Sequence, residues 1–474
     1  MTELLTTIDS VVWGPAMIAL LLGTHIYLTF RTGFIQRKLP QAIRMSVRRD
    51  PSGKGDISSF GALATALAAT IGTGSIVGVA TALLAGGPGA IFWMWIAGLF
   101  GIATKYVETY AAVKYRVRDK SGAMLGGAMF VWKRAFARPD GSVPWWATLG
   151  AVSFAAFAVI ATIGTGSAVQ AAAISGIVTS SVPAIPAVAV GVVIVVAVAA
   201  VIFGGVNSIA RVCEWLVPIM AGAYALGCLV IMGMNAPVLG EAVGLILECA
   251  FTPKAAFGGA VGSGLIMALQ FGCARGLFSN ESGLGTAPIV AAAAKTKNPA
   301  DQALISMTGA FWSTGVICLL TGLVSTMIVH PEIGEDILAN PSIFTGAALA
   351  SAAFAEIPVF GTPVLVLGMC AFAYSTILGW SYYGNRCVAY LFGPRGIKPY
   401  QVIYVAVAFF GAIGVGDVVW TISDIGNALM AIPNIIVILL LSGMIARETR
   451  HYVYDGNLDE EYGEPVPRVK GSQL

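Results

Sequence analysis

The chain has 474 residues, of which 57% are hydrophobic and only 11% are charged. About a quarter of the residues of an ordinary soluble domain are charged, so this composition excludes a soluble globular protein. The net charge of +3 excludes little by itself, because its meaning depends on how the charges are distributed.

Apolar stretches follow one another along the whole chain, separated by short polar joints. About 20 apolar residues cross a bilayer as a helix. The stretches lack the period-two pattern of outer-membrane strands, and a lipid-facing backbone must satisfy its own hydrogen bonds. We therefore predict an all-α polytopic membrane protein. Its eleven predicted transmembrane helices cover residues 12–31, 58–84, 89–114, 145–178, 186–206, 212–235, 260–292, 303–329, 359–390, 397–416 and 420–446.

Basic residues concentrate in alternate joints, which indicates the cytoplasmic side. The joint at 31–54 includes Arg48 and Arg49, and the joint at 115–138 is also rich in Lys and Arg, whereas the joint with Glu332, Glu335 and Asp336 is acidic. We expect a multi-pass protein of the plasma (inner) membrane with its N-terminus outside and its C-terminus in the cytoplasm. No basic region precedes the first span, so we expect no cleaved signal peptide.

Two predicted spans are interrupted by glycine and polar residues. The second breaks at residues 72–78 and the seventh within residues 272–285. These spans are five apart and oppositely oriented, which is typical of an inverted-repeat transporter with its binding site at the membrane midplane. We therefore divide the chain into an extra N-terminal helix with a basic loop (1–57), a first five-helix repeat (58–235), an extracellular connection with a second five-helix repeat (236–447) and a cytoplasmic tail (448–474).

One heptapeptide, Ala-Thr-Ile-Gly-Thr-Gly-Ser, occurs at both 69–75 and 161–167. The residues around the two copies differ, so we do not interpret it as the structural repeat.

The break in the second span can carry chemistry, because Gly72 and Gly74 allow the chain to leave helical geometry. Freed N–H groups attract a carboxylate, and freed carbonyl groups attract an ammonium group or Na⁺. The alternative is that these small residues only allow close helix packing.

Several polar residues within the spans have both a structural and a functional interpretation. Arg275 and Glu281 either form an architectural ion pair or face a wet cavity. Gln170 needs a partner, which is a neighbouring helix or a ligand. Lys105 with Glu108 is typical of an interfacial anchoring pair at i, i+3.

Nothing in the sequence indicates catalysis. The seven cysteines are dispersed, no nucleotide-binding loop is present, and no nucleophile, base and orienting group occur together. We expect no enzyme and no organic cofactor, and an energy source in an ion gradient.

Six ordered motifs together resemble the alanine/glycine:cation symporter family over nearly the whole chain. They are residues 68–74 (AATIGTG), 86–95 (GGPGAIFWMW), 105–108 (KYVE), 275–281 (RGLFSNE), 375–380 (STILGW) and 430–434 (MAIPN). The resemblance implies an inverted-repeat fold like that of the neurotransmitter:sodium symporters and import of alanine or glycine with Na⁺, sometimes with H⁺.

The resemblance also implies site residues. The substrate would contact Thr73, Gly74, Gln170, Gly276, Phe278 and Trp380. Sodium would be held by carbonyl groups of Ala68 and Ile71 with the hydroxyl groups of Ser375 and Thr376. The expected partners are a small neutral amino acid, Na⁺ or H⁺ and the lipid bilayer, with no nucleic acid.

The sequence departs from the family pattern at Ser75, Ser167 and Ala172, where asparagine is usual. A pocket lined by Ser and Ala would accept a slightly larger side chain. Two alternatives to Na⁺ symport stay open at this point: a proton-coupled transporter of the same fold, and an amino-acid-gated channel or sensor.

Overall fold

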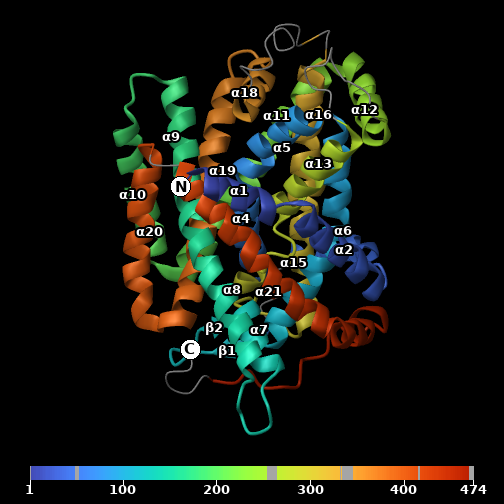
Figure 1. Ribbon diagram of the computed structural model, residues 1–474, viewed down its shortest axis with the longest axis vertical. Coiled ribbons are helices and arrows are strands. Elements are labelled where there is room, and N and C mark those ends of the chain that lie inside the picture. Colours follow the sequence, from blue (N-terminus) through green and yellow to red (C-terminus); the bar gives the residue numbers. More distant parts are fainter. Residues whose placement is uncertain are drawn as a thin grey trace.

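The computed structural model describes residues 2–47, 53–252, 264–330, 333, 345–414 and 417–468, and these residues form a helical bundle (Figure 1). The expected charges at Arg48, Arg49, Glu332, Glu335 and Asp336 lie outside these ranges. The elements are α1 (Thr2–Val12), α2 (Pro15–Arg31), η1 (Ile35–Lys38), α3 (Leu39–Ser46), α4 (Ser59–Thr70), α5 (Thr73–Gly86), α6 (Gly89–Lys114), β1 (Val117–Arg118), β2 (Met124–Leu125), α7 (Ala128–Ala135), α8 (Trp145–Ile163), η2 (Gly164–Ala168), α9 (Val169–Ser181), α10 (Ala187–Ile202), α11 (Gly205–Met234), α12 (Ala236–Phe251), α13 (Leu265–Asn280), α14 (Ala287–Ala291), α15 (Pro299–Ala310), η3 (Phe311–Cys318), α16 (Leu319–Ile328), α18 (Gly346–Ala355), α19 (Gly361–Phe392), η5 (Pro394–Gly396), α20 (Ile397–Ala412), α21 (Asp417–Thr449) and η6 (Arg450–Tyr454).

The described residues contain seven helices that are long and apolar enough to cross a membrane, or eight if the bent α4–α5 pair is one span. The chain is therefore an all-α, multi-span membrane protein. Helices α10, α13 and α20 have 16 residues each, which is short of the ~20 that a full crossing needs. The count of eleven spans stays a prediction, and residues 260–263 and 415–416 of two predicted spans lie outside the described ranges.

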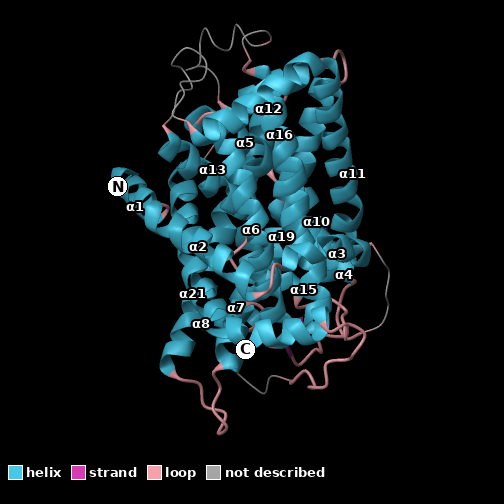
Figure 2. Cartoon of the chain, turned by 90° about the vertical axis from the view of Figure 1, so that its right-hand side faces the viewer, coloured by secondary structure: helices cyan, strands magenta, loops and turns pink. Residues whose placement is uncertain are grey.

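Two long helices organise the bundle. α6 packs against α2, α13 and α15, and α19 packs against α4, α8, α9 and α11. α9, α10 and α20 lie together along one side (Figure 1). α1 projects from the other helices in Figure 2 and packs on α21. The site described below lies where α4 and α5 meet α13 and α19.

Residues 455–468 fold back over the end of the bundle where the C-terminus lies (Figure 1). The Tyr462 N–H donates to the Lys297 carbonyl at 3.0 Å, and the Arg118 N–H donates to the Pro467 carbonyl at 2.8 Å. The Asn298 side-chain amide donates to the carbonyl groups of Leu458 (2.8 Å) and Glu460 (2.9 Å). These bonds tie the tail to loops that lie far from it in the sequence.

Candidate functional site

The α4–α5 span is broken at Ile71 and Gly72. α4 ends at Thr70, α5 begins at Thr73, and the two helices are bent by 40° relative to each other. The last carbonyl groups of α4 and the first N–H groups of α5 have no partner within their own helix. Backbone acceptors and donors therefore become available at one point inside the bundle. The predicted break in this span is present, but it is shorter than the predicted 72–78, because Gly74 and Gly78 lie inside α5.

The last turn of α4 directs carbonyl groups toward α19. Thr376 Oγ1 lies 2.9 Å from the Ala68 carbonyl oxygen, and Ser375 Oγ lies 3.4 Å from the same oxygen. Each hydroxyl is also 2.9 Å from the carbonyl oxygen of Phe372 in its own helix. The break itself lies next to these hydroxyl groups. Ile71 is the first residue after α4, and Gly72 approaches α19 so closely that an added Cβ would lie 2.6 Å from Thr376 Oγ1.

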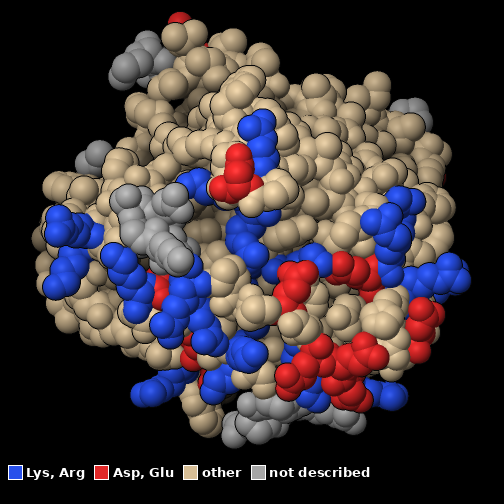
Figure 3. Space-filling view, turned by 90° about the horizontal axis from the view of Figure 1, so that it is seen from below, with Lys and Arg blue, Asp and Glu red and all other residues tan. Residues whose placement is uncertain are grey.

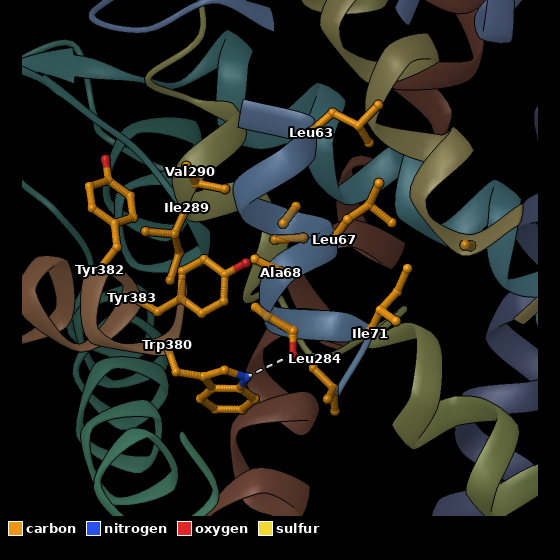
Figure 4. Packing of buried hydrophobic residues seen from close by; sticks show 14 of the residues in the cluster. Leu63, Leu67, Ala68, Ile71, Leu284, Ile289, Val290, Trp380, Tyr382 and Tyr383 are labelled. Atoms are coloured by element: carbon orange, nitrogen blue, oxygen red, sulfur yellow. Dashed lines mark hydrogen bonds between the residues drawn. The ribbon is translucent and has the colours of Figure 1, made fainter. Parts of the chain in front are cut away.

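Trp380 makes a further contact between α19 and α4. Its indole N–H donates to the Ala69 carbonyl at 3.3 Å, which Figure 4 marks with a dashed line. Figure 4 also shows Trp380 and Tyr383 of α19 on the side of α4 that carries Ala68, with Leu284 nearby.

A cavity of about 20 Å³ lies next to the break. This volume holds about one water molecule. Its walls come from α4, α5, η2, α9, α13, α19, α21 and the segment after α13. The lining residues are Ala69, Thr70, Gly72, Gly74, Thr165, Gln170, Phe278, Ser279, Glu281, Leu284, Thr376, Trp380 and Asn427.

Four of the six expected substrate residues line this cavity: Gly74, Gln170, Phe278 and Trp380. Thr73 lies beside them, because its hydroxyl donates to Gln170 Oε1 at 3.2 Å. Gly276 lies elsewhere. It is inside α13, and a Cβ at this position would meet the Met94 carbonyl of α6 at 2.7 Å.

Gln170 has protein partners and also lines the cavity. Its Nε2 donates to the Thr165 carbonyl at 3.2 Å, and its Oε1 accepts from Thr73. Both interpretations of Gln170, a partner in a neighbouring helix and contact with a ligand, are therefore compatible with the structure. Its side chain links Thr73 of the first heptapeptide copy to Thr165 of the second and also lines the cavity.

The second heptapeptide copy adopts a π-helix, η2, over Gly164–Ala168. π-Bulges are frequent at functional sites. Thr165 lines the cavity, and both its N–H and its hydroxyl contact Ser423 Oγ, at 2.6 and 2.9 Å. The two copies of the heptapeptide thus lie on two sides of one cavity, each with non-α backbone geometry.

Asn427 of α21 contributes an uncommitted amide to the cavity wall. The side chain is fully buried, and neither Oδ1 nor Nδ2 has a hydrogen-bond partner within the described part of the chain. A buried polar group without a partner is costly. This amide is therefore a strong candidate to bind a ligand.

The expected pairing of Arg275 with Glu281 does not occur. Glu281 accepts a hydrogen bond from Thr286 Oγ1 at 2.6 Å. Arg275 interacts electrostatically with Asp9 and Asp424. The two side chains therefore have different partners, although Arg275 lies within α13 and Glu281 directly follows its last residue.

Lys105 and Glu108 do not anchor the protein at the membrane surface, because both are buried, with exposed fractions of 1% and 2%. Lys105 Nζ donates to the Asn280 carbonyl at 2.7 Å, and Glu108 Oε2 accepts from the Gly283 N–H at 3.2 Å and from Asn434 Nδ2 at 3.0 Å. The pair thus holds the backbone where α13 ends. The i, i+3 spacing alone does not distinguish a surface pair from this buried one.

The three residues that depart from the family pattern do not line the cavity. Ser75 Oγ is 3.1 Å from Ser279 Oγ, and Ser167 Oγ donates to the Tyr404 carbonyl at 2.8 Å. Ala172 lies on α9, two residues after Gln170.

A family model described as the sodium:alanine symporter family matches residues 1–463. The chain belongs to the sodium:alanine symporter family. It is therefore a membrane transporter and not an enzyme.

Two known proteins are similar to this chain over nearly its whole length. The sodium/alanine symporter AgcS of Methanococcus maripaludis is 46% identical over 95% of the chain and 97% of its own length. A Haemophilus influenzae protein known as an uncharacterized transporter is also 46% identical, over 95% of the chain and 96% of its own length.

A solved structure supports the fold of this symporter-family chain. MhsT, in a crystal structure with L-phenylalanine, superposes with a TM-score of 0.59 at 13% identity and covers 85% of the chain and 94% of MhsT. At this identity the likeness concerns the fold alone, which is that of the neurotransmitter:sodium symporters.

Six residues of the cavity wall in this symporter-family chain are not among the expected substrate or sodium residues and were not singled out as candidates above: Ala69, Thr70, Thr165, Ser279, Leu284 and Asn427. For Thr165 a signal existed in the repeated heptapeptide. For Asn427 the position early in the last span left two interpretations open, closing over the site or capping a helix. Its position in the cavity depends on how α21 packs against α8.

Proposed function

We propose that the chain is a secondary symporter that imports a small neutral amino acid, alanine or glycine, together with Na⁺ by alternating access. Membership in the sodium:alanine symporter family supports the class of cargo. In such a transporter the ion and the substrate each raise the other's affinity by the same factor, so that the ion gradient drives accumulation.

The observation that carries this proposal is a cluster of four oxygen atoms at the contact of α4 with α19. Two belong to hydroxyl groups and two to carbonyl groups, so the four oxygens have only two hydroxyl protons between them. Thr376 Oγ1 lies 2.9 Å from two carbonyl oxygens, of Ala68 and Phe372, and Ser375 Oγ lies within 3.4 Å of the same two. A hydroxyl carries one proton, so it can donate to one carbonyl at a time. Clustered neutral oxygen atoms suit a hard cation such as Na⁺, with Ile71 at the break as the fourth expected ligand.

The amino acid would occupy the adjacent cavity. Its carboxylate would accept from the N–H groups of Thr73 and Gly74, where the positive end of the α5 dipole adds attraction. Its ammonium group would donate to carbonyl groups at the end of α13 near Phe278, or to Gln170 Oε1, whereas Gly276 packs against α6 away from the cavity. At about 20 Å³ the cavity holds about one water molecule, so the site has to widen to admit the amino acid, and the aromatic rings of Phe278 and Trp380 in its wall favour a small side chain.

The proposed membrane arrangement has eleven spans, with residues 58–235 and 236–447 as inverted repeats and the N-terminus outside the plasma membrane. Two interruptions support it: the broken α4–α5 pair at Ile71–Gly72, and the end of α13 at Asn280, where Glu281 adopts a left-handed conformation with φ 54°. Helix breaks at matching positions of two halves are typical of inverted-repeat transporters.

Uptake of labelled alanine and glycine into proteoliposomes tests the proposal. An inward Na⁺ gradient is compared with an inward proton gradient and with no gradient. We expect accumulation only with Na⁺. Equilibration without accumulation under both gradients would contradict the symporter proposal.

Proton coupling is the second candidate, because the carboxyl group of Glu281 lines the cavity. Accumulation driven by the proton gradient alone, and lost in Glu281→Gln, would move the coupling from the oxygen cluster to this carboxyl group.

A further inference from the structure

A second cavity, of about 250 Å³, lies on the face that carries the C-terminal tail, and it shares no lining residue with the proposed transport site. We name it the tail cavity. Its lining residues are Gly53, Lys54, Val113, Lys114, Arg116, Arg134, Thr296, Lys297, Asn298, Pro299, Glu461, Tyr462, Glu464, Pro465 and Val466. They come from five separate segments, which meet only in the folded chain.

Cations predominate in this lining: five Lys or Arg side chains face two glutamates. Lys114 pairs with Glu448 and Lys297 with Asp459, neither of which lines the cavity. Lys54, Arg116 and Arg134 remain opposite Glu461 and Glu464. Figure 3 shows this face from below, with many Lys and Arg side chains spread across it and most acidic side chains toward the lower right.

Arg116 is a fixed and poorly solvated charge. It is 6% exposed and donates to the carbonyl groups of Ala292, Ala294 and Lys54 at 3.2, 2.9 and 2.9 Å. Burial and the neighbouring Arg118 lower the pKa of the Arg116 guanidinium to about 10, against a smaller opposing effect of Asp56. These neutral carbonyl partners position the guanidinium without neutralising it.

Arg134 extends the same positive surface. It donates to the Arg116 carbonyl at 3.1 Å, and burial lowers its pKa while Glu464 raises it. Guanidinium groups held in place in this way are well suited to a phosphate group, because they offer several N–H donors in a planar arrangement.

Five of the other lining residues are apolar or aromatic: Val113, Pro299, Tyr462, Pro465 and Val466. An inorganic ion alone would leave this wall uncovered. The volume lies just below the range of about 300–1,000 Å³ that is usual for drug-sized ligands.

We propose that the tail cavity binds a small organic phosphate, with the phosphate group at Lys54, Arg116 and Arg134 and the organic part against Tyr462 and Val466. The source is either a soluble metabolite, such as a nucleoside monophosphate, or the glycerophosphate headgroup of an anionic lipid. Because the walls join the tail to the ends of α6, α7 and the segment before α15, the bound anion stabilises the docked tail.

Binding is measured by calorimetry and thermal unfolding on the purified full-length protein in neutral detergent, with AMP, glycerol 3-phosphate and neutral adenosine as probes. We expect AMP or glycerol 3-phosphate, and not adenosine, to bind and to raise the unfolding temperature. Arg134→Gln and Lys54→Gln each weaken this binding about tenfold, since each removes a charge-assisted contact. Lys54→Gln is the gentler variant, because the contact of Lys54 with Arg116 uses a backbone carbonyl.

Arg395→Gln is the matched control, because Arg395 is an exposed cation outside the tail cavity. Nanodiscs of phosphatidylglycerol and of phosphatidylcholine distinguish the two sources. Stabilisation by phosphatidylglycerol that Lys54→Gln removes, without binding of soluble phosphates, assigns the site to a lipid headgroup. Absence of both effects, or equal effects in wild type and both cavity variants, overturns the proposal.

Discussion

At the scale of single residues, the most specific prediction concerns Thr376 and the Na⁺ dependence of uptake. Its hydroxyl lies between the carbonyl groups of Ala68 and Phe372, and Thr376→Ala removes one proposed oxygen ligand of Na⁺ without changing the cavity's polar amides. We expect the Na⁺ concentration for half-maximal alanine uptake to rise about tenfold, or about 1.4 kcal/mol. The order of preference among amino acids stays unchanged.

Thr376→Ser is the control for this experiment, because it keeps the oxygen atom and removes only the methyl group. It should retain the Na⁺ dependence of the wild type. If Thr376→Ala also retains it, Thr376 does not bind the ion.

Asn427 gives the second residue-scale prediction. Its amide is buried without a partner in the described part of the chain, so Asn427→Leu removes no protein hydrogen bond and relieves a desolvation cost of about 1–3 kcal/mol. We expect the unfolding temperature to stay equal or to rise, while the KM for alanine rises about tenfold or uptake is lost.

Thermal unfolding and uptake measured on the same Asn427→Leu preparation check this expectation. Asn207→Leu, at an exposed amide of α11 outside the cavity, serves as the control. A fall in stability together with normal uptake would show that Asn427 supports packing and not substrate binding.

At the scale of secondary structure, the break between α4 and α5 requires glycine at position 72. Its φ of −131° is open to any residue, so the requirement is one of space. A Cβ would lie 2.6 Å from Thr376 Oγ1. We expect Gly72→Ala to displace α19 from the oxygen cluster and to reduce Na⁺-driven uptake at least about tenfold, since misplacement by about 1 Å can cost a hundredfold in a preorganised site.

Gly78→Ala is the matched control on the same helix, because the nearest atom to its Cβ would be Arg275 Cδ at 3.9 Å. It should fold and transport normally. Normal uptake by Gly72→Ala would mean that the close approach of Gly72 to Thr376 is not needed for transport.

At the scale of the whole molecule, the number of spans decides where the termini lie. An odd number, such as the proposed eleven, places them on opposite sides of the membrane. We expect a C-terminal fusion to green fluorescent protein to fluoresce in the cytoplasm and an N-terminal epitope to be accessible on intact spheroplasts. Both termini on one side would require an even number of spans.

Much of the protein could be predicted from local sequence. The apolar runs predict membrane helices because hydrocarbon leaves the backbone no partner but itself. Gly72 and Gly74 mark the helix break for a similarly local reason. The motif at Ser375 and Thr376 indicates a family role, and the structure brings both hydroxyls to the Ala68 carbonyl.

The sequence by itself determined the membrane class, the positions of most helices, the break in α4–α5 and the family. Tertiary structure alone decided which polar groups meet: Lys105 and Glu108 are buried at the end of α13, Arg275 and Glu281 are separated, and Asn427 reaches the cavity. The physical reason is how far apart along the chain the interacting residues lie. Helix formation and hydrophobicity depend on neighbours in sequence, whereas a buried charge or amide is satisfied by groups that come within 3 Å only after the helices pack.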